Sequence, residues 1–95
     1  MITVALLAFS WQGAAWADDD HNKALQLREM GKIMALEEIL KHAKKEVNGR
    51  ILELELERED GVYLYEILIL DAKGQLWEIE IDATSGKILK RELED

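Results

Sequence analysis

Residues 51–93 read ILELELERED, then Gly61, VYLYEILILDAK, Gly74, QLWEIEIDATS, Gly86 and KILKREL. Within these runs apolar side chains alternate with acidic ones, which is the period-two pattern of a half-buried strand. A glycine separates each run from the next, as is usual where the chain must turn sharply. The stretch therefore predicts an antiparallel meander of four strands.

The turns predict which side chains share a face of this sheet. Asp60-Gly61 is a strong two-residue hairpin signal of type I′. Its register gives three expected cross-strand pairs on one face: Leu56 with Tyr65, Leu54 with Ile67, and Leu52 with Ile69.

The second turn, Asp71–Gly74, allows two registers. A two-residue loop would put Glu78 and Glu80 on the apolar face, whereas a three-residue loop with Gly74 in the left-handed region would put Trp77, Ile79 and Ile81 there. Burying two unpaired carboxylates is costly, so we expect the three-residue loop.

A third turn, Asp82–Gly86, precedes a last strand from Lys87 to Leu93. We expect Asp82 to accept backbone N–H bonds and Gly86 to adopt a positive φ.

Two helices are expected before the strands. Asp18-Asp19-Asp20 predict the cap of a helix from His21 to Met30, ended by Gly31. A second helix, ended by Asn48-Gly49, has one apolar stripe made of Leu36, Ile39, Leu40, Ala43 and Val47. The fold class is α+β: two N-terminal helices followed by a four-stranded antiparallel β-meander, with the second helix packed on one sheet face.

The N-terminal residues 1–17 carry no charged side chain and differ from the rest of the chain. An apolar stretch from Ile2 to Phe9 is followed by Ala15-Trp16-Ala17, which has the form of a signal-peptidase site. The alternative of an uncleaved membrane anchor is disfavoured, because a span requires ~20 apolar residues. We therefore expect a signal peptide at 1–17 cut after Ala17, a helix and lead-in at 18–34, one domain at 35–95, and a periplasmic or secreted location.

The composition excludes several classes of partner. The net charge is −8 at pH 7, and nucleic acids and anionic membrane surfaces require a cationic patch. The chain has no cysteine, hence no disulfide and no thiolate ligand. We expect no nucleic acid and no stable membrane insertion after signal cleavage, while basic proteins remain suitable partners.

The second face of the predicted sheet mixes glutamates with leucines. Glu55, Glu66 and Glu80 align across three strands, and each opposed pair is repulsive by about 0.2–1 kcal/mol. Lys90, opposite Glu80, relieves this repulsion. A solvated face, a docking face for a basic partner, a self-association face and a cation site all remain open. The candidate partner-binding residues are Glu53, Glu55, Glu57, Leu64, Glu66, Leu68, Glu78 and Glu80.

The run Ile81-Asp82-Ala83-Thr84-Ser85-Gly86-Lys87-Ile88-Leu89 resembles the strand-turn-strand of the PepSY family, and the likeness extends over 36–93. The resemblance implies a noncatalytic module that restrains a peptidase or modulates an envelope sensor protein. The family motif carries no catalytic residue. Its signature positions Asp82, Thr84 and Gly86 are better explained by turn geometry than by chemistry.

The residue types argue against catalysis. Ser85 lies in a turn, and His21 and His42 have no spacing that suggests a nucleophile with its base. We therefore expect no enzyme, no cofactor-binding residue and no metal ligand set. The predicted function is a noncatalytic exported protein-binding module, such as a peptidase inhibitor. The alternatives are a self-associating structural domain, for instance a homodimer, and a periplasmic protein that binds a small ligand or cation.

Overall fold

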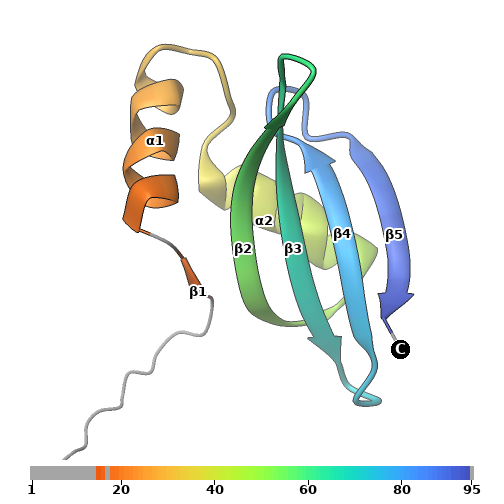
Figure 1. Ribbon diagram of the computed structural model, residues 1–95. Coiled ribbons are helices and arrows are strands. Elements are labelled where there is room, and N and C mark those ends of the chain that lie inside the picture. Colours follow the sequence, from red (N-terminus) through yellow and green to blue (C-terminus); the bar gives the residue numbers. More distant parts are fainter. Residues whose placement is uncertain (1–14, 17, 95) are drawn as a thin grey trace, which may run out of the picture.

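The computed structural model describes residues 15–16 and 18–94 (Figure 1). The predicted α+β class is confirmed: two helices precede a four-stranded antiparallel sheet formed by β2–β5, and a short β1 pairs parallel with β2 at its edge. The predicted signal peptide lies outside the described residues except for β1. The elements are β1 Ala15–Trp16, α1 Asp18–Glu29, α2 Leu36–Glu46, β2 Gly49–Glu59, β3 Val62–Asp71, β4 Leu76–Asp82 and β5 Ile88–Glu94.

The turn between β2 and β3 has the predicted geometry. Asp60 and Gly61 both have positive φ values, 51° and 81°, as a type I′ turn requires. The expected pairs of Leu56 with Tyr65 and of Leu54 with Ile67 are confirmed.

The expected pairing of Leu52 with Ile69 is wrong, because Ile51 stands opposite Ile69. The register shifts between Ile51 and Glu53, which leaves Leu52 as the extra residue of a β-bulge. Ile51 and Leu54 both contact the core, and strict alternation cannot place residues three apart on one face. The bulge resolves this conflict.

The turn between β3 and β4 takes the three-residue form that we expected. Gly74 has a φ of 80°, and the Asp71 N–H donates to the Gln75 carbonyl at 2.9 Å. As a result, Trp77, Ile79 and Ile81 stand opposite core-facing residues of β3.

The bounds of both helices differ from the prediction. α1 begins at Asp18 rather than at His21, so the aspartates expected to cap it form its first turn. Its last residue is Glu29, one before the predicted Met30. The expected stop at Gly31 has a positive φ of 73°, and the Lys32 N–H donates to the Leu27 carbonyl at 2.9 Å.

α2 ends at Glu46, before the expected Asn48-Gly49 stop, because Val47 is already extended. Gly49 instead opens β2. A Cβ at Gly49 would collide with the carbonyl oxygen of Leu70, so β3 approaches too closely for any side chain there.

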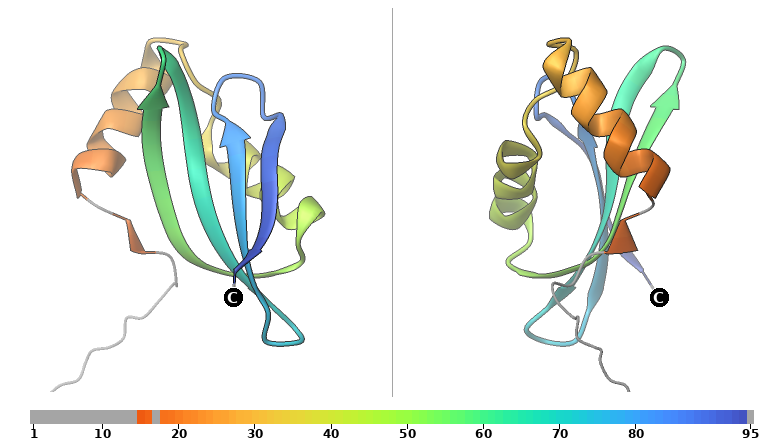
Figure 2. Two further views of the ribbon diagram at one scale, coloured as in Figure 1. Left: turned by 45° about the vertical axis from the view of Figure 1, so that its right-hand side comes forward. Right: turned by 90° about the vertical axis from the view of Figure 1, so that its left-hand side faces the viewer.

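The core lies between α2 and one face of the sheet (Figures 1 and 2), as predicted. α2 contributes Ile39 and Ala43, which are fully buried. An ion pair of 3.7 Å between Glu46 on α2 and Arg91 on β5 also joins the two layers. The fully buried residues of the sheet are Tyr65, Ile67, Ile69, Ile79 and Ile81.

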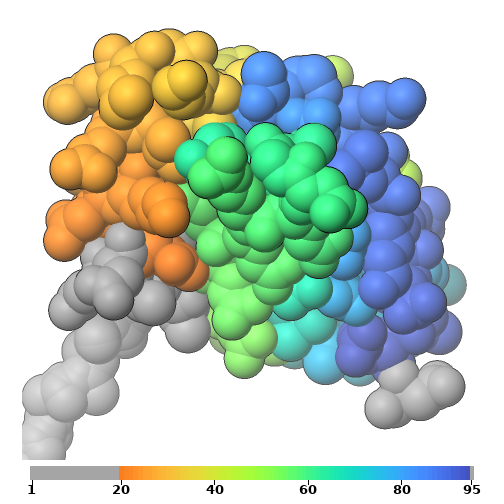
Figure 3. Space-filling view, turned by 45° about the horizontal axis from the view of Figure 1, so that its top comes forward, coloured from red at the N-terminus to blue at the C-terminus, as the bar shows by residue number. Residues whose placement is uncertain are grey.

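The end of the molecule formed by the β2–β3 turn is flanked by two other segments. In the space-filling view (Figure 3), α1 and its connection to α2 lie on one side of this hairpin, and the β4–β5 turn lies on the other. Thr84 of the β4–β5 turn donates its hydroxyl to the Lys32 carbonyl at 3.0 Å, which ties this turn to the helical connection.

Candidate protein-binding face

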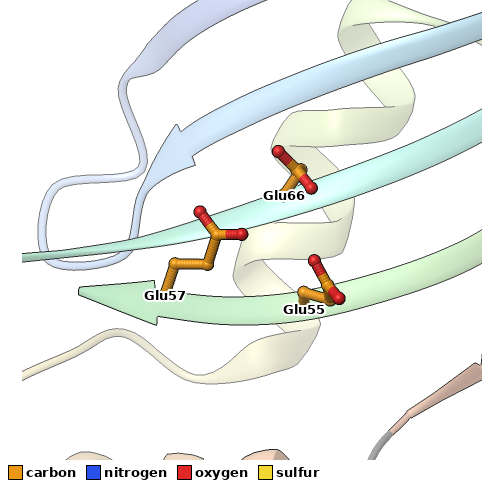
Figure 4. A group of neighbouring side chains, drawn as sticks. All are labelled: Glu55, Glu57 and Glu66. Atoms are coloured by element: carbon orange, nitrogen blue, oxygen red, sulfur yellow. The ribbon is translucent and has the colours of Figure 1, made fainter. Parts of the chain in front are cut away.

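The sheet face that points away from α2 holds the predicted site residues, and we call it the acidic face. Figure 4 shows three of its glutamates projecting from β2 and β3 on the side opposite α2. Glu55 stands opposite Glu66, and Glu66 opposite Glu80, so the expected row across three strands is present. The acidic face consists of Glu53, Glu55 and Glu57 on β2, Leu64, Glu66 and Leu68 on β3, and Glu78 and Glu80 on β4.

The carboxylates of the acidic face approach one another closely. Within each of three groups, one oxygen per residue lies within 4.8 Å of the others. The third group includes two residues of β5 that were not predicted, Glu92 and Glu94. The predicted pairing of Lys90 with Glu80 could have revealed them, because Glu92 and Glu94 follow Lys90 at the period of two that returns a strand to the same face. The groups are Glu55, Glu57 and Glu66; Glu66, Glu78 and Glu80; and Glu78, Glu92 and Glu94.

Lys90 on β5 lies opposite Glu80, as predicted, and partly neutralises the acidic face. Its Nζ lies 3.2 Å from Glu78 Oε1 and 3.9 Å from Glu80 Oε2. A third carboxylate, of Glu92, lies 3.6 Å away. The hydrogen bond to Glu78 is the main reason why the pKa of Lys90 is raised. Within residues 18–94, the ion pairs of the acidic face all use this lysine.

Glu66 lies in the middle of the row and has the most perturbed carboxyl group. Its hydrogen bond with Glu78, then burial and then the charge of Glu57 raise its pKa to about 8. The same hydrogen bond, together with Lys90, lowers the pKa of Glu78. At neutral pH, Glu66 is therefore protonated and donates to the Glu78 carboxylate.

The carboxyl group of Glu57 also has a raised pKa. Burial, followed by the charges of Glu55 and Glu59, raises its pKa. Two members of the acidic face thus bind protons more tightly than an isolated carboxylate does, which is the expected response to crowded negative charge.

The apolar members of the acidic face differ in accessibility. Leu64 is only 4% exposed, so its side chain offers a partner almost no surface. Leu68 is half-buried and borders a hollow of about 190 Å³ with five glutamates. Besides Leu68, this hollow is lined by Glu53, Glu55, Glu66, Glu78 and Glu94.

The turn signature, Asp82, Thr84 and Gly86, lies after β4, where the side chains of Asp82 and Thr84 make hydrogen bonds to backbone groups. Asp82 Oδ1 accepts the N–H of Thr84 at 2.8 Å and that of Ser85 at 3.2 Å. Gly86 has a φ of 79°, and a Cβ there would come within 2.8 Å of His42 Nε2. His42 is half-buried against this turn, whereas His21 is exposed on α1.

The family of the chain follows from comparison with known proteins. Residues 33–92 match the family model described as PepSY, peptidase propeptide and YPEB domain. The chain therefore belongs to the PepSY family, and the sheet with α2 forms the part that matches.

A relative is the uncharacterized protein YkoJ of Bacillus subtilis (strain 168), with 37% identity over 71 residues. The match covers 73% of this chain but only 42% of YkoJ, so the chain spans less than half of that relative. No solved structure matches the chain. Neither α1 nor α2 is long and apolar enough to cross a bilayer.

Proposed function

We propose that this chain is a noncatalytic, exported protein-binding module that docks a basic partner on its acidic face. The observation that carries the proposal is the collection of glutamates from four neighbouring strands on one face, with Lys90 as the cation in its ion pairs among the described residues.

The energetics of the acidic face favour a cationic partner. Repulsion between crowded carboxylates contributes to the raised pKa values of Glu57 and Glu66 in the free protein. Positive side chains of a partner would relieve this repulsion, and the charge of the face would speed the encounter. Leu68 and Val62, which is 43% exposed, add apolar contact area.

The family supports a role in binding a peptidase or an envelope protein. The matching model is named for a peptidase propeptide, a segment of a peptidase precursor. The signature residues Asp82 and Thr84 are occupied with backbone hydrogen bonds, which fits a module without catalytic chemistry. The signal-like residues 1–17 support export, and an exported module would meet its partner in the periplasm or outside the cell.

The absence of cysteine allows a direct test of this proposal. Glu55→Cys places a single thiol on the acidic face, and Glu37→Cys places one on the exposed side of α2. Each purified variant carries a photocrosslinker on this thiol and is exposed to an extract of the cell envelope. We expect a basic protein that crosslinks to the Glu55→Cys variant and not to the Glu37→Cys variant, and that unlabelled wild-type protein competes away.

Identical crosslinked products from both variants would contradict docking on the acidic face. A captured peptidase is then assayed with the wild-type protein and with Leu68→Lys. Inhibition by the wild type that Leu68→Lys weakens would establish the inhibitor role, because Leu68 borders the glutamate hollow.

Cation binding is a second candidate, favoured by the three groups of carboxylates within 4.8 Å. Calcium prefers oxygen ligands, and a cation that binds only the folded state raises the unfolding temperature. We would measure thermal unfolding with and without calcium for the wild type and for Glu57→Gln. An unchanged unfolding temperature of the wild type would rule out this candidate.

A further inference from the structure

The outer edge of β2 is occupied by the N-terminal part of the same chain. β1 pairs parallel with β2, with Ala15 opposite Glu53 and Trp16 opposite Leu54. Two residues further along β2, the Leu56 N–H donates to Asp20 Oδ2 of α1 at 3.3 Å. The right panel of Figure 2 shows β1 and α1 in front of this edge. Two successive elements therefore contact the edge.

The backbone of β2 explains why this edge accepts a strand. Successive N–H groups of a strand point to opposite sides, and the Leu56 N–H points away from β3 because it donates to α1. The N–H of Leu54 then points to the same outer edge, beside β1. An edge with such groups is a template for a strand supplied by another chain.

We propose that the edge of β2 around Glu53 and Leu54 is a strand-acceptor site, which β1 holds and which an extended segment of a partner protein takes when β1 leaves. Signal cleavage after Ala17 would remove β1 and open the site. The inference concerns an edge and not the acidic face, so it goes beyond the proposed function and does not rest on it.

α1 limits the length of the segment that can bind. Asp20 already accepts the Leu56 N–H, so an added strand cannot continue along the edge beyond this point while α1 stays in place. The acceptor is therefore the half of β2 that precedes Leu56.

The side chains of β2 define the chemistry of the partner segment. Residues of an added strand that stand opposite Glu53 and Glu55 would lie on the acidic face, and those opposite Leu54 would lie on the side of α2. Opposite charges favour cross-strand pairs. The segment that fits therefore alternates basic with apolar residues.

A second copy of the chain fits this edge less well. Two β2 strands paired with one another would bring glutamates of one copy against glutamates of the other, which is repulsive. We therefore assign the site to a basic partner segment and treat dimerisation as an outcome of the test.

The test compares the full chain with the double variant Ala15→Pro/Trp16→Pro, in which β1 loses both N–H donors. The probe is a fluorescent hexapeptide, Lys-Val-Lys-Val-Lys-Val, whose binding is followed by fluorescence anisotropy. We expect binding to the double variant to be about tenfold tighter or more, because β1 no longer competes for the edge. Amide exchange at Leu54 in the variant should slow when the peptide binds.

Three outcomes would overturn the proposal. A hexapeptide methylated at every backbone nitrogen keeps its charge but has no N–H group to pair as a strand, so equal binding of this peptide would overturn the proposal. Equal affinity of the hexapeptide for the full chain and the double variant would overturn it as well. Sedimentation of the double variant as a dimer would assign the edge to a second copy and would also overturn it.

The double substitution precedes the first buried residue of the described core, Ala24, and circular dichroism checks that the variant folds. The single variant Trp16→Pro serves as a milder replacement if it does not. The fully methylated hexapeptide can still meet the acidic face through its charges but cannot pair with the edge, so the comparison of the two peptides makes the two proposals fail separately.

Discussion

Single residues decide whether a turn tolerates a side chain. Gly74 and Gly86 have almost the same backbone conformation, with φ values of 80° and 79°, but different surroundings. A Cβ on Gly74 would meet no atom within 4 Å, whereas a Cβ on Gly86 would come within 3.1 Å of both His42 and Met34. The family signature glycine is thus required both for its conformation and for its small size.

The substitution of each glycine by alanine separates these two requirements. Gly74→Ala should lower the free energy of unfolding by about 1–2 kcal/mol, the cost of the left-handed conformation. Gly86→Ala should cost about 1–3 kcal/mol more, because the methyl group overpacks the contact with His42. Urea unfolding measures both. His42→Ala should recover part of the loss in Gly86→Ala only, and an equal loss in the two single variants would contradict this account.

The proton on Glu66 makes stability depend on pH. Its pKa is about 8 in the folded protein and near 4.5 when unfolded, so the folded state binds more protons between these values. This contribution to stability is complete below pH 4.5 and is lost as the pH rises through about 8. The free energy of unfolding should therefore fall with rising pH in this window.

Glu66→Gln should flatten this pH dependence, because the amide has no proton to lose. Urea unfolding at several pH values measures it, with Glu53→Gln as the control that removes a charge of the same face outside the Glu66–Glu78 hydrogen bond. A slope that persists in Glu66→Gln and disappears in Glu53→Gln would refute the assignment.

At the scale of elements, the sequence predicted the sheet better than the helices. Turn chemistry at Asp60-Gly61 and Gly74 determined the registers of β2–β3 and β3–β4 near those turns. The bulge at Leu52 could not be predicted, because leucine there continues the alternation and only the competing contact of Ile51 with the core displaces it. The predicted register of β2 with β3 is therefore correct near the turn and wrong beyond the bulge.

The position of α1 was also beyond prediction. Its buried residues, Ala24 and Leu27, form a weak apolar pattern, and its contact with β2 through Asp20 joins a side chain to a distant backbone N–H. The stripe of α2 was strong enough to predict both the helix and the face that it covers. On the acidic face, the row of glutamates was predictable, whereas burial of Leu64 was not.

The stripe of α2 supplies a prediction about the contact between helix and sheet. Ile39 is fully buried, so Ile39→Ala should lower the free energy of unfolding by about 2–5 kcal/mol. Leu25 on α1 is 45% exposed, and Leu25→Ala should change stability by less than about 1 kcal/mol. Denaturant unfolding, followed by circular dichroism, measures the free energy of unfolding of both variants and of the wild type. Similar losses would mean that α2 does not hold the main core contact.

At the scale of the whole molecule, the excess of negative charge acts against folding. The net charge is −8, and much of it is concentrated on one sheet face. Repulsion within a compact chain is screened by salt, since the Debye length falls from about 30 Å at 0.01 M to about 3 Å at 1 M.

Added sodium chloride should therefore raise the unfolding temperature over this range. Glu55→Gln/Glu80→Gln should be more stable at low salt and gain less from added salt, because the charges of both carboxylates repel the carboxylate of Glu57 and raise its pKa. Differential scanning calorimetry measures the two proteins side by side. A salt-induced decrease in the unfolding temperature of the wild type would show that attractive ion pairs, such as those of Lys90, dominate instead.

The order of strands β2-β3-β4-β5 also has a kinetic consequence. Each of these strands pairs with its neighbour in sequence, so the sheet can form hairpin by hairpin without closing a long loop. The chain contains no proline, so no slow cis–trans isomerisation of a prolyl bond delays refolding. A chain diluted from denaturant should therefore regain its structure rapidly and in a single phase.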